Sequence, residues 1–434
     1  MKRFLNFLLR LELLFLIILV PIWVVRPELV WVFFLPLVFW GIGYVIEGQF
    51  FPKSLLDRPI LGLSILSLAS LIITPVLETS LTKVIGVFLG IFFYYAFIRA
   101  AKGLSAVRIV VAVILVFIGM GIVLLGLIGG SFPNKIPVLA KLADLLPEMI
   151  MSIPGAESGF HPNAISGTLI LFFPLTFVFL LRWKFIKQRF SKIYNSLLTA
   201  VYIFVVLGFA VESFYLLAGQ SRGAWVGLFF GVLIVTLWSK YPRLEKPLIY
   251  MIPGLNVALY LIIVLSRTLH NRWILILQNQ NLHSTIGQRL VIWEWATKVF
   301  EDFPLTGVGY NVFRLAAPVL YPRSQLIRTD FSHAHNFIFD VGVSLGVGGM
   351  LMLLWMWVIY TRFLLIELHS RKGEGKYMYY GLLIGWLAFF AFSLMDTIPL
   401  GSKLGLLFWF FMAFGQILAR STSSDNIPQI NPRA

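Results

Sequence analysis

Residues 331–361 read "FSHAHNFIFDVGVSLGVGGMLMLLWMWVIYT", a polar entry with two histidines followed by a long apolar run. A helix needs about 20 apolar residues to cross the hydrocarbon core of a membrane. Similar runs recur along the 434-residue chain, which is 59% hydrophobic and 12% charged, with a mean hydropathy of +0.89. The sequence therefore predicts an all-α polytopic membrane protein.

The apolar runs predict about twelve transmembrane helices. The first 25 residues have a basic head but no small-residue cleavage site, so they are interpreted as a retained span rather than a removed signal. The predicted spans cover residues 5–25, 28–46, 60–77, 84–99, 109–130, 165–182, 197–218, 223–238, 247–266, 335–361, 377–395 and 403–419.

Positive charge alternates between the loops, which predicts the orientation. With the N-terminus placed in the cytoplasm, the basic runs, such as "RWKFIKQRFSK" at 182–192, fall in inner loops, and the outer turns hold little more than one basic residue each. An even span count also returns residues 421–434 to the cytoplasm as a disordered tail. The net charge of +16 is thus a topological signal that anionic membrane lipid would strengthen, and it does not indicate nucleic acid binding.

Two outer segments are longer than simple turns, a smaller loop at 131–164 and a large one at 267–334 that lies between the ninth and tenth spans. Within the large loop, "TIGQRLVIWEWATKVFEDFPL" at 285–305 predicts an amphipathic helix. Leu290, Trp293, Thr297 and Phe300 would lie on one side, and Pro304 would end the helix. A helical outer subdomain of the single transmembrane domain 1–434 is expected.

The stretch "GQSRGAWVGL" at 219–228 predicts an anion site at the start of the eighth span. Ser221 is placed to cap the helix, and Arg222 falls in its first turn, so backbone N–H groups and a guanidinium would face the same way. Phosphate suits such a site. The alternative is an interfacial arginine above Gly223, Gly227 and Gly231, a small-residue stripe for helix packing.

His335 is a candidate general base at the tenth span. On a regular helix, Gly342, Gly346 and Gly349 would lie below it on one face, so the histidine would cap a groove. An imidazole titrates near neutral pH and can accept a proton from a substrate held there. A histidine bonded to a neighbouring carbonyl, with glycines that only pack helices, is the structural alternative.

His333 and His335 form a His-x-His pair, which raises the question of a metal. Asp330 and Asp340 flank the pair, but the latter falls inside the span, and a convincing set of acidic ligands is not evident. No metal and no cofactor are therefore expected. Arginines dominate this side of the membrane instead, at positions 267, 272, 289, 314, 323 and 328.

These stretches resemble the O-antigen ligase and polymerase superfamily of bacterial envelope glycan enzymes. The resemblance rests on "SRGAW", "GQRLVIW", "GVGYNVF" and "HN" followed nine residues later by "GVGG", and it extends from about 160 to 400. It implies a GT-C-like membrane glycosyltransferase of the bacterial inner membrane with a periplasmic active site. The implied donor is a glycan on undecaprenyl pyrophosphate.

The resemblance also assigns roles to residues. His335 would take the proton of the acceptor hydroxyl, which attacks the anomeric carbon with inversion, and Arg222 and Arg289 would hold the departing pyrophosphate. Asn336 and Trp225 match motif positions with roles in orientation or packing, and Ser221 and His333 are supporting candidates. Preorganised guanidinium groups suit this chemistry, because the leaving pyrophosphate gains negative charge in the transition state.

Three functions remain open at this stage. A ligase would transfer the glycan to a lipid A-core sugar, and a polymerase would transfer it to another repeat unit. The ligase is preferred for its "SRGAW" stretch and its long tenth-span loop. A transporter or flippase is the alternative of a different class, but such proteins tend to carry charges near the membrane midplane, whereas this chain gathers them at one face.

Overall fold

The computed structural model describes residues 2–26, 29–101, 117–127, 136–143, 160–268, 285–322, 331–371 and 375–420. Helices and their connections account for all of these residues, which contain no strand. The N-terminal part comprises α1 (Lys2–Arg10), α2 (Glu12–Val25), η1 (Val30–Phe34), α3 (Pro36–Glu47), α4 (Asp57–Ile73) and α5 (Leu77–Ala100). The all-α prediction is confirmed over the described residues.

The rest of the described chain continues the helical pattern. The middle part comprises α7 (Pro137–Ala143), α8 (Pro162–Leu181), α9 (Trp183–Ala218), α10 (Arg222–Lys240), η2 (Pro242–Leu244) and α11 (Glu245–Thr268). The C-terminal part comprises α13 (Thr285–Asp302), α14 (Phe313–Leu320), α15 (Phe337–Ser370), α16 (Gly375–Ser393) and α17 (Leu406–Arg420).

Six helices of the described residues are long and apolar enough to cross a membrane. They cover Leu77–Ala100, Pro162–Leu181, Thr199–Ala218, Arg222–Lys240, Pro242–Leu265 and Phe337–Ser370, and shorter apolar helices cover Val32–Glu47, Phe117–Leu127 and Leu406–Ala419. The protein is therefore a polytopic membrane protein. The count of twelve stays a prediction, and most of the 131–164 loop and the whole 421–434 tail lie outside the described residues.

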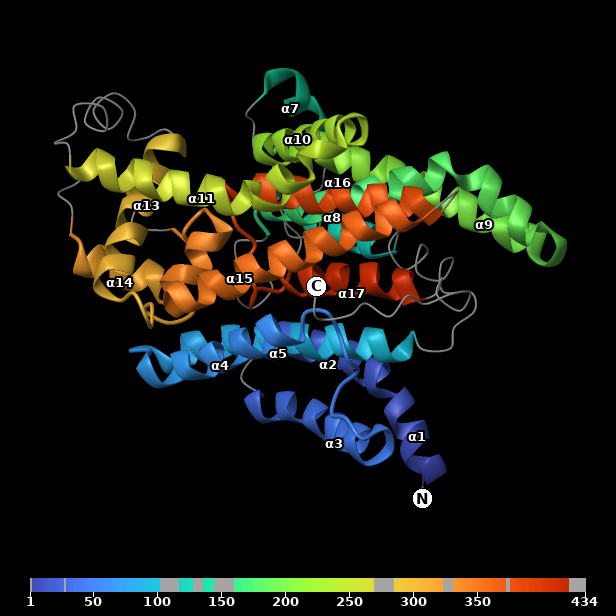
Figure 1. Ribbon diagram of the computed structural model, residues 1–434, viewed down its shortest axis with the longest axis horizontal. Helices are drawn as coiled ribbons and strands as arrows, with labels where there is room; N and C mark the ends of the chain where they lie inside the picture. Colours follow the sequence, from blue (N-terminus) through green and yellow to red (C-terminus); the bar gives the residue numbers. More distant parts are fainter. Residues whose placement is uncertain are drawn as a thin grey trace.

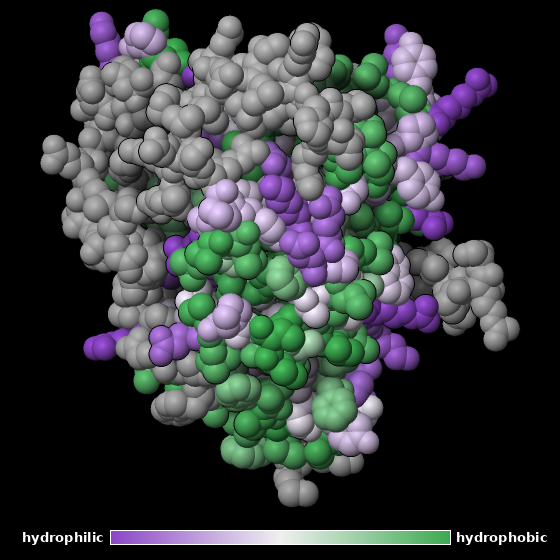
Figure 2. Space-filling view, turned by 90° about the vertical axis from the view of Figure 1, so that its left-hand side faces the viewer, coloured by the Kyte–Doolittle hydropathy of each residue, from purple (hydrophilic) through white to green (hydrophobic). Residues whose placement is uncertain are grey.

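The long helices lie side by side across Figure 1, and α13 and α14 pack at its left-hand end. Helix α16 packs against α8 and α10, and α17 packs against α5. The view onto the left-hand end shows hydrophilic residues gathered in the middle, above a largely hydrophobic surface (Figure 2).

Helices α10 and α16 approach closely along the predicted glycine stripe. A Cβ at Gly227 would lie 2.5 Å from the carbonyl oxygen of Ala388, and one at Gly231 would lie 2.7 Å from that of Ile384. Glycine is needed here because the two backbones nearly touch. The stripe packs helices, as the structural alternative proposed.

The predicted groove below His335 is absent from the described first turns of α15. His335 precedes α15, and the helix is broken at Gly346, where φ is 70° and ψ is −170°, so the regular helical wheel does not apply. A Cβ at Gly346 would lie 2.5 Å from the carbonyl carbon of Leu305, and one at Gly342 would lie 2.8 Å from the ring of Phe300. Gly342 and Gly346 allow α13 and the segment after it to pack directly against α15. The groove prediction is therefore wrong.

Helix α13 is more deeply buried than the amphipathic pattern predicts. Trp293, Thr297 and Phe300 are buried as expected, and Leu290 is partly buried against the same cluster. Val291, Trp295 and Ala296, on other sides of the helix, are also buried. Residues of α11, α14 and α15 surround the helix, which fixes α13 firmly beside the start of α15.

Candidate active site

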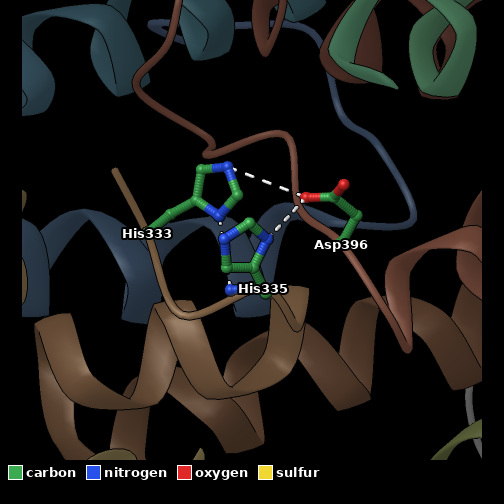
Figure 3. Close-up of side chains that lie close together, drawn as sticks. All are labelled: His333, His335 and Asp396. Carbon is green, nitrogen blue, oxygen red and sulfur yellow. Dashed lines mark hydrogen bonds and ion pairs between the residues drawn. The ribbon is translucent and has the colours of Figure 1, made fainter. Parts of the chain in front are cut away.

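Four segments distant in sequence meet at the start of α15. They are the loop 331–336, the loop 394–405 that follows α16, the N-terminus of α8 and the first turns of α13. Their meeting point is Asp396, whose side chain is 8% exposed. Figure 3 shows both histidine rings directed at this carboxylate.

One carboxylate oxygen faces the two histidines. The Nδ1 atom of His335 lies 3.1 Å from Oδ1 of Asp396, and Nε2 of His333 lies 3.7 Å from the same oxygen (Figure 3). The backbone N–H of Thr397 donates to this oxygen as well, at 3.0 Å. Asp396 thus holds both rings through a single, well-anchored oxygen atom.

The hydrogen-bond pattern assigns the tautomers of both rings. Because Asp396 is an acceptor, Nδ1 of His335 carries the hydrogen, and Nε2 of His335 has no hydrogen-bond partner in the described part of the chain. Nδ1 of His333 accepts the backbone N–H of His335 at 3.3 Å, so its hydrogen is on Nε2. In its neutral form, His335 therefore presents Nε2 as a nitrogen that can accept a proton.

The loop that carries His335 is fixed by its own backbone. Ala334 donates its N–H to Oδ1 of Asp340 at 3.0 Å and accepts from the indole of Trp293 at 3.0 Å. Asn336 caps α15 by accepting from the N–H groups of Ile338 and Phe339, both at 3.0 Å. His335 itself has a φ of 49°, a left-handed conformation that non-glycine residues adopt at a cost.

Two donors occupy the second carboxylate oxygen of Asp396. Nη2 of Arg289 lies 3.4 Å from Oδ2, and the side-chain amide of Asn163 donates to it at 3.1 Å. Arg289 is 13% exposed, and its buried Nε has no partner within the described residues. A guanidinium has five N–H donors, so Arg289 retains donors for a substrate beside His335.

Electrostatics keep Asp396 ionised. Burial by itself would raise the pKa of Asp396, but the hydrogen bond from His335, the neighbouring imidazoles and the Arg289 guanidinium outweigh it and hold this pKa well below its usual range. Burial, His335, Arg289 and His161 lower the pKa of His333 to about 3, against the opposing effect of Asp396. At neutral pH the cluster therefore contains a carboxylate and a neutral His333.

The predicted N-cap at the start of α10 is confirmed, and the anion site there stays a prediction. Oγ of Ser221 accepts the N–H of Ala224 at 3.4 Å as an N-cap, and Arg222 is the first residue of the helix. Arg222 is exposed and makes no hydrogen bond or ion pair with any described residue. The indole of Trp225 donates to the carbonyl oxygen of Leu216 at 2.7 Å, which is a packing role.

Arg222 nevertheless begins its helix at the same end of the molecule as Asp396. A Cβ at the adjacent Gly223 would lie 3.2 Å from the ring of Phe392, four residues before Asp396. Arg222 and Arg289 thus belong to one end of the bundle, with only Arg289 in contact with the cluster. Arg323 and Arg328, two of the arginines predicted on this side of the membrane, lie outside the described residues.

The sequence-based view that the two histidines lack an acidic partner is wrong, because the structure supplies Asp396. Ligand atoms of His333, His335 and Asp396 lie within 4.8 Å of one another, a grouping that could hold a metal ion. The guanidinium of Arg289 on the same carboxylate opposes a divalent cation electrostatically, and the free Nε2 of His335 suits proton transfer. The expectation of no metal stays a prediction.

Fold and site together define a polytopic membrane protein with a histidine–aspartate pair, a second histidine and an arginine at one end of its helices. Residues 207–354, about a third of the chain, match the model of the family described as O-Antigen ligase. The matched residues include Arg222, Arg289, His333 and His335. No curated protein matches the chain significantly.

Proposed function

We propose that the protein is a membrane glycosyltransferase that uses a polyprenyl-pyrophosphate glycan as donor. The observation that carries the proposal is the hydrogen bond of 3.1 Å from Nδ1 of His335 to Asp396, which leaves Nε2 of the neutral ring free to accept a proton. Arg289 contacts the other oxygen of the same carboxylate. The match of residues 207–354 to the family described as O-Antigen ligase supports the same class of reaction.

In the proposed reaction, the acceptor hydroxyl loses its proton to Nε2 of His335. Its oxygen forms a bond to the anomeric carbon of the donor sugar while the bond from that carbon to the pyrophosphate oxygen breaks on the opposite side, which inverts the configuration. The charge of the resulting imidazolium would be stabilised by Asp396, which already accepts from Nδ1. No external reductant, oxidant or nucleotide is needed, because the pyrophosphate is the leaving group.

Arginine side chains would stabilise the departing polyprenyl pyrophosphate. Arg289 lies at the histidine cluster, and Arg222 begins α10 at the same end of the molecule. Guanidinium groups bind phosphate oxygens through paired hydrogen bonds. In a partly dry site, donors that are already in place stabilise the developing charge more than water does.

The acceptor decides between two activities of this class. We propose a ligase, in which the acceptor is a hydroxyl of a lipid A-core sugar at the periplasmic face of the bacterial inner membrane. A polymerase would use the same histidine and arginines and differ in its acceptor. The transporter alternative fits less well, because the ionisable cluster lies where helices begin and end, away from their midpoints.

The test is glycan transfer by purified protein in detergent, with an undecaprenyl-pyrophosphate glycan, a lipid A-core acceptor and EDTA. We expect transfer by the wild type and a loss of about 10²–10⁴-fold in His335→Ala, the usual range for removing a general base. Arg289→Gln should lose both rate and donor binding. His369→Ala, a histidine near the opposite end of α15, is the control and should retain full activity.

Each outcome has a distinct meaning. Longer glycans on the carrier without a labelled core would identify a polymerase. Transfer at the wild-type rate by a folded His335→Ala variant would overturn the catalytic role of His335. Loss of wild-type activity in EDTA, with recovery after a divalent cation is added, would overturn the metal-independent mechanism.

A further inference from the structure

A second group of charges lies beside the histidine cluster, on α5, α14 and α15. Lys83 of α5 lies within electrostatic range of Arg314 of α14 and Asp340 of α15. Asp340 is in turn within electrostatic range of His335. All of Lys83, Arg314 and Asp340 are half-buried. Lys83 therefore lies between a second cation, Arg314, and a carboxylate, Asp340, that is close to the proposed catalytic base.

Hydrogen bonds to the segment 308–310 join α5 and α15. Oγ of Ser80, one turn before Lys83, donates to the carbonyl oxygen of Tyr310 at 2.9 Å. On the other side of Tyr310, the N–H of Val308 donates to the carbonyl oxygen of Val343 at 2.8 Å. Arg314 lies four residues after Tyr310, in the first turn of α14. Residues 308–310 thus lie between α5 and α15, and Arg314 follows them at the start of α14.

The two cations lack acceptors of their own. Neither Lys83 nor Arg314 makes a hydrogen bond or an ion pair of 4.0 Å or less with any residue in the described ranges, and Nε of Arg314 is buried without a partner there. Oδ1 of Asp340 accepts the N–H of Ala334. Buried donors are normally paired, and unpaired ones are costly. An anion that accepts from both cations would satisfy them.

We infer that Lys83 and Arg314 form a second anion-binding site, which takes a phosphate or carboxylate group of a substrate. The inference deepens the proposed function and rests on it for the identity of the substrate. Among described residues, Lys83 and Arg314 make no direct contact with Arg289 or Asp396. The loop 333–336 lies between the two groups: its histidine rings point at Asp396, and the N–H of Ala334 points at Asp340. A second anionic group, apart from the phosphate at Arg289, would bind on the Asp340 side of this loop.

Binding is tested with inorganic pyrophosphate, because a ligand that binds only the folded state raises the melting temperature. Pyrophosphate should stabilise the purified wild type, and a smaller rise should remain in the double variant Arg222→Gln/Arg289→Gln. Adding Lys83→Met and Arg314→Met to that variant should remove the remaining rise. Lys240→Met, at the opposite end of α10, should leave it unchanged. A remaining rise that persists without Lys83 and Arg314, or no rise in the wild type, would overturn the inference.

A charge-preserving variant separates loss of binding from loss of folding. Lys83→Arg keeps the positive charge, so it should retain the stabilisation by pyrophosphate that Lys83→Met loses. If both variants lose it equally, Lys83 is a packing residue and the inference is wrong. This comparison needs no catalytic turnover, so failure of the proposed glycosyl transfer would not be mistaken for failure of the second site.

Steady-state kinetics identify which substrate carries the anion. Losing a hydrogen bond to a charged group should raise one Michaelis constant by about tenfold or more. An increase in KM for the polyprenyl-pyrophosphate glycan would assign the site to the donor, and an increase in KM for the core acceptor would assign it to the acceptor. Unchanged constants for both substrates in Lys83→Met and Arg314→Met would contradict a substrate-binding role.

Discussion

His335 has two chemically different ring nitrogens, and Asp396 creates the difference. The carboxylate accepts from Nδ1 at 3.1 Å, so the proton is held on the nitrogen that faces the protein. The other nitrogen keeps its lone pair. A histidine alone would sample both tautomers, so the catalytic role that we propose belongs to the pair rather than to His335.

Replacing Asp396 with asparagine tests this pairing. An amide can donate to Nδ1, which would favour the tautomer with its hydrogen on Nε2, and we expect the transfer rate to fall by about 10²-fold or more. Asn163→Ala removes one donor to Asp396 but leaves the carboxylate, so its loss should stay near tenfold. Initial rates at saturating donor measure both effects. Equal activity of Asp396→Asn and wild type would refute the orienting role.

His333 predicts a pH dependence of stability. Its pKa in the folded protein is lowered to about 3, whereas an unfolded histidine titrates near 6.5. Below pH 6.5 the unfolded chain binds the extra proton, so stability is complete above this pH and declines as the pH falls toward 3. At pH 5 the loss should be about 2 kcal/mol.

The measurement is the melting temperature in detergent at pH 7.5 and pH 5.0. We expect a smaller decrease for His333→Gln than for the wild type, because glutamine has no proton to bind in this range. Asp396 contributes little to this window, because a lowered carboxylate pKa costs stability mainly at still lower pH. Parallel decreases in the two proteins would show that His333 does not cause the effect.

At the residue scale the sequence indicated three of the four side chains of the cluster, and it missed the carboxylate that joins them. His333 and His335 could be predicted because they lie in a polar stretch next to an apolar run, and Arg289 because "GQRLVIW" resembles a motif of the family. Asp396 could not be predicted, because it lies 61 positions after His335, in "LMDTIPLGSKLG" (394–405). Only the packing of α16 beside α8 and α15 places it next to His335. One signal could have indicated Asp396: it is an acidic residue in the short loop between the predicted spans 377–395 and 403–419, on the same predicted side of the membrane as His335.

At the element scale, hydropathy located the helices better than it located their ends and breaks. The predicted span 223–238 agrees with α10, Arg222–Lys240. Helix α9 begins at Trp183, well before the predicted start at 197, because the basic run is helical although it is too polar to be counted as a span. The left-handed φ at Gly346 depends on contact with Leu305, which no local pattern reveals.

Gly346→Ala tests the break in α15. Its φ of 70° is unfavourable for alanine, and the new Cβ would lie 2.5 Å from the backbone of Leu305. Strain and overpacking together should cost about 2–4 kcal/mol. Gly41→Ala is the control, because nothing lies within 4 Å of its Cβ position. Denaturation in detergent compares the two, and a Gly346→Ala variant as stable as Gly41→Ala would show that the break is not required.

At the scale of the whole molecule, the helices give the protein one chemically distinct end. The starts of α8, α10 and α15 and the end of α16 meet there, with α13 and α14 packed against them (Figure 1). The sequence predicted this grouping through the alternation of basic loops. The same alternation predicts that this end faces the periplasm, which the helices alone do not establish.

The absence of cysteine from the sequence makes this orientation directly measurable. Ser332→Cys would place the only thiol of the chain at an exposed position beside the histidine cluster, and Arg243→Cys would place it at an exposed position in η2, at the opposite end of α10. A maleimide that cannot cross the inner membrane should label the first variant in spheroplasts and the second only after the membrane is permeabilised. The reverse pattern would put His335 in the cytoplasm, where a periplasmic acceptor could not reach it, and both the topology and the ligase proposal would then be wrong.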